Sequence, residues 1–328
     1  MSVVLVTGVN GFVGSHVAER LLASGHRVRG LVRSSSDLAF LRHLDLELRA
    51  GDITDRKSVE GAADGVEIVV HVAGLASDWG PYERFHRVNV EGTRTVAEAA
   101  NEAGVRRLVH ISTTAVHGFP GFRNADESYP MPETGFPYCE TKRIAEAWLA
   151  GYMRSTPMEI TIIRPGNVFG PRDHTFVGQY LDALGDGKIA YIDRGRHRTC
   201  PTYVENLADG IRLACFEPAA NGEAFLVRDG LDIDWRTFTE KLADELGVGR
   251  PKFSVPYPLA YPAAAAMEAA WRLFRNPLPP LLTRYRISNG GRDYHFSIAK
   301  ARRGVGYEAV VGLEEGGGGT GPLDRGRC

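Results

Sequence analysis

Two residues four positions apart, Tyr138 and Lys142, could together move a proton. On a helix this spacing places the phenol and the ammonium on one face. A free tyrosine, with a pKa of about 10, is a poor acid or base at neutral pH. A cation held beside it favours the phenolate and lowers that pKa, so the hydroxyl could exchange a proton with an alcohol or a carbonyl oxygen. The pair suits dehydrogenase chemistry if a nicotinamide lies beside it, although solvated surface pairs also have this spacing.

A glycine-rich turn near the N-terminus predicts a site for such a dinucleotide. The apolar run at residues 3–6 is typical of a buried strand, and a helical pattern starts at Val13. Gly8, Gly11 and Gly14 stand at this junction. Backbone N–H groups and the dipole at a helix N-terminus favour a pyrophosphate, and the missing side chains let it approach. The spacing G-x-x-G-x-x-G differs by one residue from the G-x-G-x-x-G fingerprint.

Together these features resemble the extended branch of the short-chain dehydrogenase/reductase superfamily. Further stretches match that family in the expected order: Gly51-Asp52-Ile53, Ala73-Gly74, Asn89-Val90-Glu91-Gly92-Thr93 and the strand and loop from Leu108 to Gly118. The resemblance implies that Tyr138 donates a proton to the substrate oxygen, while Lys142 lowers the pKa of Tyr138 and binds the nicotinamide ribose. Thr113 would complete the catalytic triad by a hydrogen bond to the substrate oxygen. Alignment without gaps selects it from three adjoining hydroxyls, with Thr114 next.

The same resemblance implies which residues contact the cofactor and the substrate. The expected cofactor-binding residues lie in the glycine turn, at the strand ends and in the catalytic pair: Gly8, Gly11, Phe12, Val13, Gly14, Arg33, Asp52, Ile53, Val72, Ala73, Gly74, Asn89, Tyr138, Lys142, Pro165 and Val168. The expected substrate contacts are Trp79, Thr114 and His117. In the family, the turn that contains Pro165 and Val168 touches the nicotinamide carboxamide.

The end of the second predicted strand bears on the choice of nicotinamide cofactor. NAD normally requires an acid about 20 residues beyond the glycines to hold the ribose 2′-hydroxyl, whereas an arginine accommodates the 2′-phosphate of NADP. Here Val32 and Arg33 stand where the acid would be. We therefore expect NADP(H) to be preferred, with Arg33 and Ser34 on the 2′-phosphate. NAD(H) stays open, since Arg33 could also be a solvated residue after a strand.

Stretches in the C-terminal half resemble the 3β-hydroxysteroid dehydrogenase branch, and 76–82 and 279–285 look like bacterial reductases of 2-alkyl-3-oxoalkanoates. This implies an NAD(P)-dependent oxidoreductase with a largely apolar, steroid-like or β-keto acyl substrate. Two alternatives stay open. A nucleotide-sugar epimerase, dehydratase or reductase could hold a diphosphate with Arg194, Arg196 and Arg198. A non-catalytic NADP-sensing regulator commonly loses the tyrosine or the lysine, and both are present here.

Alternating β and α patterns up to about residue 170 predict an α/β fold, a Rossmann-like doubly wound parallel sheet with a smaller C-terminal α/β substrate lobe. Strands are predicted at 3–6, 27–32, 46–49, 67–72, 107–112 and 159–164. We expect a dinucleotide-binding domain over residues 1–175 and a substrate-binding lobe over 176–315, of which 199–227 partly returns to the sheet. The glycine-rich tail 316–328 has too few apolar residues to pack, so it is expected to be disordered.

Composition and charge bound the partners. A chain of 328 residues that is 43% hydrophobic can bury a sizeable core, and a net charge of -1 without a long basic run gives no footprint for nucleic acid. The four cysteines form no C-x-x-C pair, which argues against a zinc site and a disulfide framework, so no metal is expected. Since Met1 to Val6 already reads as a strand, no signal peptide is expected and the protein is predicted to be cytoplasmic.

Helical regions bear on membranes and on assembly. Residues 259–274 are apolar, and too short and too interrupted to span a bilayer, so no integral membrane segment is expected. They predict either a core or lid helix for an apolar substrate or a helix that rests on a membrane surface. Residues 82–103 and 137–154 are predicted as long helices, which the resemblance pairs across a homodimer. The residues expected to permit close approach there are Ala97, Ala100, Ala145 and Ala147.

Overall fold

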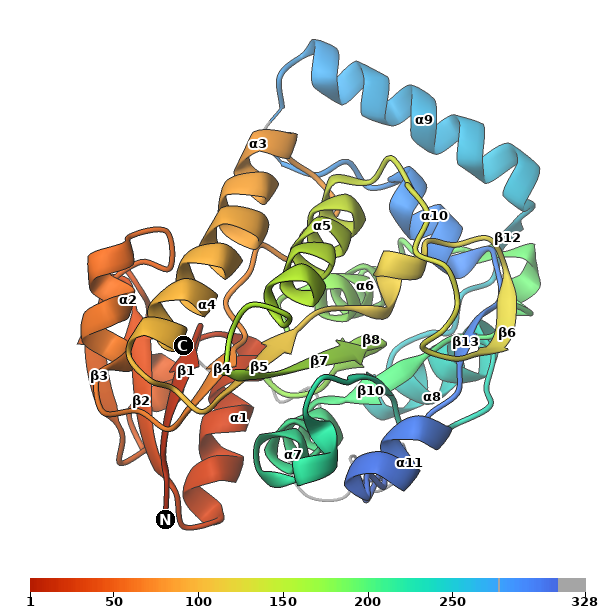
Figure 1. Ribbon diagram of the computed structural model, residues 1–328. Coiled ribbons are helices and arrows are strands. Elements are labelled where there is room, and N and C mark those ends of the chain that lie inside the picture. The colour runs from red at the N-terminus through yellow and green to blue at the C-terminus, as the bar shows by residue number, and fades with distance from the viewer. Residues whose placement is uncertain (277, 312–328) are drawn as a thin grey trace.

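A parallel sheet of seven strands runs through the centre of the computed structural model, which describes residues 1–276 and 278–311 (Figure 1). Its strand order is β11-β7-β5-β4-β1-β2-β3. The strands are β1 (Val3–Thr7), β2 (Arg27–Val32), β3 (Glu47–Ala50), β4 (Ile68–His71), β5 (Arg107–Ile111), β7 (Glu159–Pro165) and β11 (Ala224–Val227). All six predicted strands are present, each within two residues of its predicted ends.

Helices cover both faces of the sheet, so both faces are buried. Successive side chains of a strand point to opposite faces, and they therefore enter two separate cores. Val4 and Val6 of β1 pack in one core with α1 (Phe12–Ala23), α7 (Val204–Phe216) and α11 (Ala299–Val305). Leu5 packs in the other core, with α2 (Arg56–Ala63), α4 (Gly92–Glu102) and α5 (Pro137–Tyr152). Helices on both faces of a parallel sheet confirm the predicted doubly wound α/β fold.

The strand order reverses between β1 and β4. The chain proceeds from β1 outward to β2 and β3, then returns to add β4, β5 and β7 on the other side of β1. Such a reversal leaves a crevice beyond the carboxyl ends of the two strands where it occurs, because their connections leave in opposite directions. The glycine turn follows β1 and therefore opens into this crevice.

The C-terminal part adds helices beyond the carboxyl edge of the sheet. They are α6 (Phe176–Gly185), α8 (Trp235–Leu246), α9 (Tyr257–Leu273) and α10 (Arg284–Gly290). Short strand pairs accompany them: β8 (Asn167–Phe169) with β10 (Pro201–Tyr203), β9 (Tyr191–Ile192) with β12 (Ser254–Val255), and β6 (Phe122–Ala125) with β13 (Tyr294–Phe296). Within the predicted lobe, α7 packs on α1 and β11 pairs with β7. The domain boundaries themselves stay a prediction, and the tail 316–328 lies outside the described residues.

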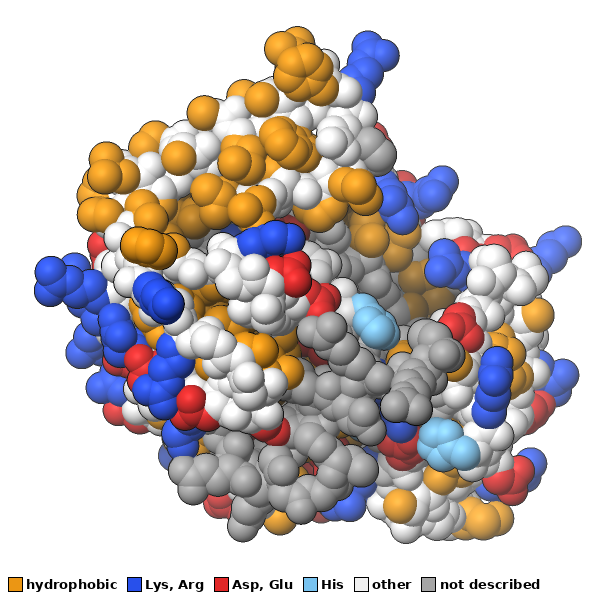
Figure 2. All heavy atoms as spheres, turned by 180° about the vertical axis from the view of Figure 1, so that it is seen from behind, with side chains coloured by type: hydrophobic (Ala, Val, Ile, Leu, Met, Phe, Trp, Pro, Cys, Tyr) orange, Lys and Arg blue, Asp and Glu red, His pale blue; other side chains and the backbone are white. Residues whose placement is uncertain are grey.

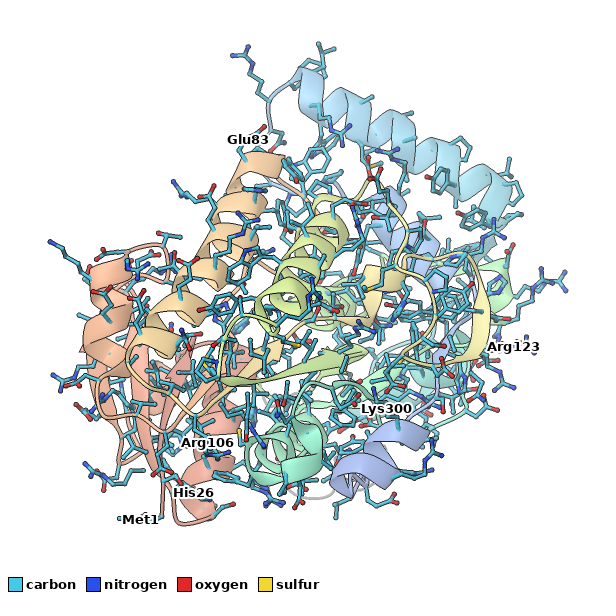
Figure 3. All side chains as sticks on the ribbon, viewed as in Figure 1. Met1, His26, Glu83, Arg106, Arg123 and Lys300 are labelled. Atoms are coloured by element: carbon cyan, nitrogen blue, oxygen red, sulfur yellow. The ribbon has the colours of Figure 1, made fainter. Side chains whose placement is uncertain are left out.

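Charged side chains such as Glu83 and Arg123 point away from the sheet at the rim of the molecule (Figure 3). The predicted helix over 82–103 consists of α3 (Tyr82–Phe85), a π-helical turn (η2, His86–Glu91) and α4. Ala97, Ala100 and Ala145 are fully buried inside the monomer, so the prediction that they permit close approach of a second subunit is wrong.

Within the described ranges, no helix combines the length and the apolarity needed to cross a membrane.

Candidate active site

A cleft of about 650 Å³ lies beyond the carboxyl ends of β1, β4 and β5, at the reversal of strand order. Every residue predicted to bind the cofactor lines this cleft except Ser34 and Asn89, and so does Thr113. The sequence motifs that carried the prediction are up to 160 residues apart, from Gly8 to Val168. The fold brings most of them together because they follow strands that end at the same edge of the sheet, and α5 adds Tyr138 and Lys142.

The glycine turn is packed too tightly to accept side chains. Gly8 has a φ of +68°, which favours glycine, and a Cβ at Gly14 would lie 2.1 Å from the Gly8 carbonyl oxygen. The turn is closed by a 3.0 Å hydrogen bond from the Gly11 N–H to the same carbonyl. It leads into the first turn of α1, whose free N–H groups can bind an anion. The residues present therefore fit the pyrophosphate of a dinucleotide.

The far end of the cleft is lined by Arg33, Ser36 and Asp52, together with Arg84 and Arg87. Arg33 follows β2 directly, and its N–H donates to the Ser36 hydroxyl at 3.1 Å. Ser34, predicted to contact the 2′-phosphate together with Arg33, lies outside the cleft lining. Ser36 lines the cleft beside Arg33 instead. Asp37, the next acid along the chain, instead accepts a 2.9 Å hydrogen bond from the Ala39 N–H.

Asn89 is buried behind the cleft wall rather than in it. Its side chain exchanges hydrogen bonds with both backbone groups of Leu75, accepting from the N–H at 2.7 Å and donating to the carbonyl at 3.2 Å. It also donates to the Thr141 hydroxyl at 3.1 Å. Asn89 thus ties the segment after β4 to α5, which carries Tyr138 and Lys142.

Tyr138 and Thr113 lie next to each other in the wall of the cleft. Thr113 lies two residues beyond the end of β5, and its hydroxyl oxygen accepts a 3.1 Å hydrogen bond from the Ala115 N–H, which leaves the hydroxyl hydrogen able to donate. Tyr138 lies in the first turn of α5. Burial raises the pKa of Tyr138 to about 12, opposed by a hydrogen bond with Thr113. Burial is the largest influence on the phenol, and the lowering of this pKa by Lys142 stays a prediction.

Lys142 lies one helical turn beyond Tyr138, and its side chain is 5% exposed. The ammonium donates a 2.7 Å hydrogen bond to the carbonyl of Ile111, the last residue of β5. Burial lowers the pKa of Lys142 to about 8, and the charge of Glu146 opposes that shift. The ammonium borders the cleft next to Gly74, so it is placed to bind hydroxyl groups of a ribose there.

Of the three adjoining hydroxyls, Ser112 and Thr113 line the cleft and Thr114 does not. The Thr114 hydroxyl donates to the Pro165 carbonyl at 3.1 Å and accepts from the Tyr294 hydroxyl at 2.8 Å. The Ser112 hydroxyl is buried without a hydrogen-bond partner among the residues that the structure describes. Ser112 is therefore a candidate contact that sequence reasoning missed, since a buried hydroxyl on a cleft wall can bond to a ligand.

The three residues predicted to bind substrate lie outside the cleft lining. Besides Thr114, His117 is fully buried and bonds to the Pro130 carbonyl at 3.1 Å. Trp79 donates to the Asn276 carbonyl at 3.3 Å and lies under the Arg272 guanidinium. The aromatic wall of the cleft instead comes from Phe176, Tyr285 and Tyr294.

A buried ion pair supports the catalytic helix. Arg164 of β7 and Glu146 of α5 are 5% and 2% exposed, and their side chains approach to 2.6 Å. Arg164 also reaches the Glu127 carbonyl and the His117 ring, each at 3.4 Å. Because Glu146 is one turn beyond Lys142, this pair fixes α5 to the sheet at the depth where Lys142 meets the cleft.

Among the described residues, no group of three His, Cys, Asp or Glu side chains could hold a metal ion. Arg194, Arg196 and Arg198, proposed for a sugar diphosphate, lie outside the cleft lining. Arg198 instead pairs with Asp232 at 2.9 Å.

Residues 4–227 match the NAD dependent epimerase/dehydratase family. A 4-hydroxy-2-methyl-3-oxo-4-farnesyl-3,4-dihydroquinoline-1-oxide ketoreductase of Stigmatella aurantiaca is 32% identical, over 95% of this chain and 93% of its own. A 2-alkyl-3-oxoalkanoate reductase of Stenotrophomonas maltophilia is 30% identical, over 95% and 96%. A 3 beta-hydroxysteroid dehydrogenase/Delta 5→4-isomerase of Mycobacterium tuberculosis is 33% identical, over 95% and 87%. These matches confirm the resemblance, and the chain belongs to the NAD dependent epimerase/dehydratase family.

Proposed function

We propose that this protein is an NAD(P)-dependent oxidoreductase that reduces a ketone, or oxidises a secondary alcohol, on a largely apolar substrate. The observation that carries the proposal is the convergence of Thr113, Tyr138 and Lys142 on the cleft that also holds the glycine turn. Relatives over nearly the full length of the chain are named as reductases and dehydrogenases of apolar compounds, which supports it.

In this proposal a bound nicotinamide supplies or accepts the hydride. The Tyr138 hydroxyl donates its proton to the carbonyl oxygen, which gains negative charge as the ketone is reduced. Thr113 orients that oxygen with its free hydroxyl hydrogen, and the ammonium of Lys142 binds ribose hydroxyls. In the reverse direction the Tyr138 phenolate would accept the proton of the alcohol.

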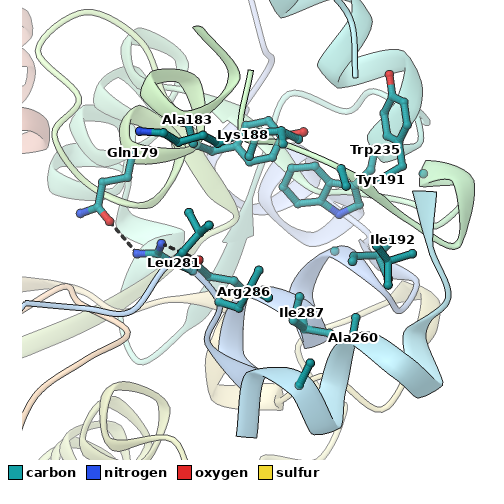
Figure 4. Close-up of a pocket in the computed structure, with 18 of the residues that line it drawn as sticks. Gln179, Ala183, Lys188, Tyr191, Ile192, Trp235, Ala260, Leu281, Arg286 and Ile287 are labelled. Atoms are coloured by element: carbon teal, nitrogen blue, oxygen red, sulfur yellow. Dashed lines mark hydrogen bonds between the residues drawn. The ribbon is translucent and has the colours of Figure 1, made fainter. Parts of the chain in front are cut away.

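The apolar character of the substrate is inferred from a chamber of about 370 Å³ beside the cleft (Figure 4). The two spaces share Phe176 and Gln179. At their border Arg286 donates to Gln179 at 2.7 Å and to Asp78 at 2.7 Å. The remaining lining is mainly aliphatic and aromatic, including Tyr180, Tyr191, Ile192, Trp235, Leu259, Leu281 and Ile287. An alkyl or polycyclic group fits such a lining better than a sugar does.

A cofactor-linked activity screen tests the proposal. It compares steroids, β-keto esters, aryl ketones and nucleotide sugars with NADPH and NADH, or with their oxidised forms for alcohol substrates. We expect turnover on an apolar ketone or alcohol. Turnover confined to nucleotide sugars would instead support the epimerase alternative, and cofactor binding without any turnover would support the regulator.

Arg33→Ala is expected to weaken NADPH binding by about 1.5–3 kcal/mol and to leave NADH binding nearly unchanged, because only NADPH places a phosphate beside this guanidinium. Calorimetric titration of the wild type should accordingly find NADPH bound more tightly than NADH. Arg27→Ala, at the other end of β2 and exposed, is the matched control and should alter neither affinity. Equal wild-type affinities for the two cofactors would contradict the NADP preference.

A homodimer through α4 and α5 is a further part of the proposal. With three of the four alanines buried, the outer face here consists of Ala147 with Trp148 and Tyr152, whose rings stack at 4.8 Å. Light scattering at micromolar concentration should give twice the chain mass, and Trp148→Arg should reduce it to the monomer, because a charge would be buried without a partner. A wild-type monomer would refute the dimer.

A further inference from the structure

Helix α9 lies along the outside of the C-terminal lobe and presents most of its circumference to solvent (Figure 1). Only three of its residues are buried, Ala260, Ala264 and Glu268, which form a stripe with a spacing of one turn. The opposite side carries large apolar side chains, continued by the segment after it. The exposed fractions are 64% for Leu259, 78% for Leu273 and for Phe274, 69% for Leu278 and 50% for Leu281.

We call these exposed apolar side chains, with the exposed alanines between them, the α9 face: Leu259, Ala263, Ala266, Leu273, Phe274, Leu278 and Leu281. Hydrophobic side chains gather over α9 in the space-filling view (Figure 2). Single exposed apolar residues are ordinary on a soluble protein, but a contiguous patch of this kind marks a contact with another apolar surface.

Basic residues stand at both ends of the α9 face. Lys252 and the exposed Arg292, which stacks on Tyr257 at 4.2 Å, lie at its start, and Arg272 and Arg275 lie at its end. Three other basic residues nearby in the sequence do not add to this charge, because they form ion pairs: Arg250 with Asp244, Arg284 with Glu268, and Arg286 with Asp78. Glu268 is buried and bonds to Arg284 at 2.8 Å, so it adds no negative charge to the face.

An apolar helix face rimmed by cations is complementary to the surface of an anionic bilayer, where apolar side chains enter the acyl region and cations meet the headgroups. A second copy of this chain fits less well. A two-fold contact between α9 faces would bring basic ends together whether the helices ran parallel or antiparallel, and like charges repel.

The apolar chamber adds a second observation. Leu259, Ala260 and Ala263 line the apolar chamber, whose wall on this side also includes Leu281 and Leu282 (Figure 4). The same short stretch of α9 therefore separates the chamber from the outside. A compound in an acyl phase at this face would therefore be separated from the chamber by this stretch of α9.

We propose that the α9 face docks on the surface of an anionic lipid bilayer, with α9 lying in the interfacial plane. Docking places the chamber against the bilayer, so that an apolar substrate can load from the lipid phase. Docking on the bilayer is independent of the proposed oxidoreductase activity. Loading of an apolar substrate from the lipid rests on that proposed activity.

Sedimentation with lipid vesicles tests the docking. The full chain is expected to bind vesicles of phosphatidylcholine that contain about one third phosphatidylglycerol, more weakly at high salt, and to bind pure phosphatidylcholine vesicles far less. Leu273→Glu with Phe274→Glu should weaken binding to the anionic vesicles at least about tenfold, because both side chains would enter the acyl region. Arg272→Gln with Arg275→Gln should weaken it about tenfold and leave the weak binding to neutral vesicles unchanged.

Val310→Glu is the matched control, since Val310 is 70% exposed but outside the α9 face, and it should bind vesicles like the wild type. All substituted side chains are exposed, so circular dichroism and turnover of a short, water-soluble ketone should match the wild type. Absence of wild-type binding to anionic vesicles would overturn the proposal. So would a dimer that the double glutamate variant dissociates without any vesicle binding, because a second copy would then cover the face. Neither result depends on whether the protein is an oxidoreductase.

Discussion

Tyr138→Phe is expected to lower the turnover of ketone reduction at least about 10²-fold while the fold and NADPH binding survive. The variant keeps the ring, which packs near Tyr285, and removes only the hydroxyl that would donate the proton. A positioned general acid contributes typically about 10² to 10⁴ in rate, so this figure is the lower end of the range. Steady-state kinetics on the best ketone measure the turnover, and calorimetry with NADPH measures the affinity for the cofactor.

Tyr152→Phe is the control for this prediction, since Tyr152 ends the same helix on the outer side, away from the cleft. Tyr152→Phe should reduce the ketone with the same turnover as the wild type. If Tyr138→Phe retained nearly wild-type activity, another group would be the acid, and the roles proposed for Thr113 and Lys142 would be abandoned with it.

The pH dependence of reduction follows from the two buried groups. Only the protonated phenol can donate, and burial raises the pKa of Tyr138 to about 12, so the phenol stays protonated at neutral pH. The pKa of Lys142 is lowered to about 8, so the ammonium loses its proton as the pH rises through that value. A fall in reduction rate near pH 8 is therefore expected to come from Lys142, and it should persist in the residual activity of Tyr138→Phe.

Glu146→Ala is expected to lower the free energy of unfolding by about 3–5 kcal/mol, because it leaves the guanidinium of Arg164 buried without its countercharge. Urea denaturation of the cofactor-free protein measures the effect. Asp244→Ala is the control, since it breaks the exposed pair with Arg250 and should cost no more than about 1 kcal/mol.

A second variant separates the loss of the pair from the loss of packing. Glu146→Leu together with Arg164→Met removes both charges and keeps apolar volume, so it should recover much of the stability that Glu146→Ala loses. If Glu146→Ala unfolded at the wild-type urea concentration, the pair would not hold α5 against the sheet.

The parts of the fold that the sequence predicts are those determined by local patterns. The strands are short apolar runs flanked by turns, and the glycine turn follows β1 directly, so neighbouring residues suffice to place them. Once the strands are placed, the residues directly after them can be assigned to the cleft at the carboxyl edge of the sheet. This explains why Gly8, Asp52, Ala73 and Val168 could be expected at one site.

Other features depend on residues far away along the chain. Thr114 looks like an available hydroxyl until Tyr294, 180 positions later, donates to it. Arg286 and Asp78, which border the apolar chamber, are 208 positions apart, and no local pattern links them. The raised pKa of Tyr138 comes from burial, which spacing to Lys142 cannot reveal. Ala97 and Ala100 face the sheet rather than solvent because of how α4 is rotated against it.

The residues that form the cleft come from distant parts of the chain, so they emerge from the ribosome at different times during synthesis. Domains generally fold from the N-terminus as the chain emerges. The glycine turn, the end of β2 and the ends of β4 and β5 have all emerged by Thr113, about a third of the way along the chain. Tyr285 and Tyr294, which complete the aromatic wall, emerge close to the end. The wall proposed to hold the nucleotide is therefore synthesised largely first, and a nascent chain stalled before α10 lacks Tyr285 and Tyr294 of the aromatic wall.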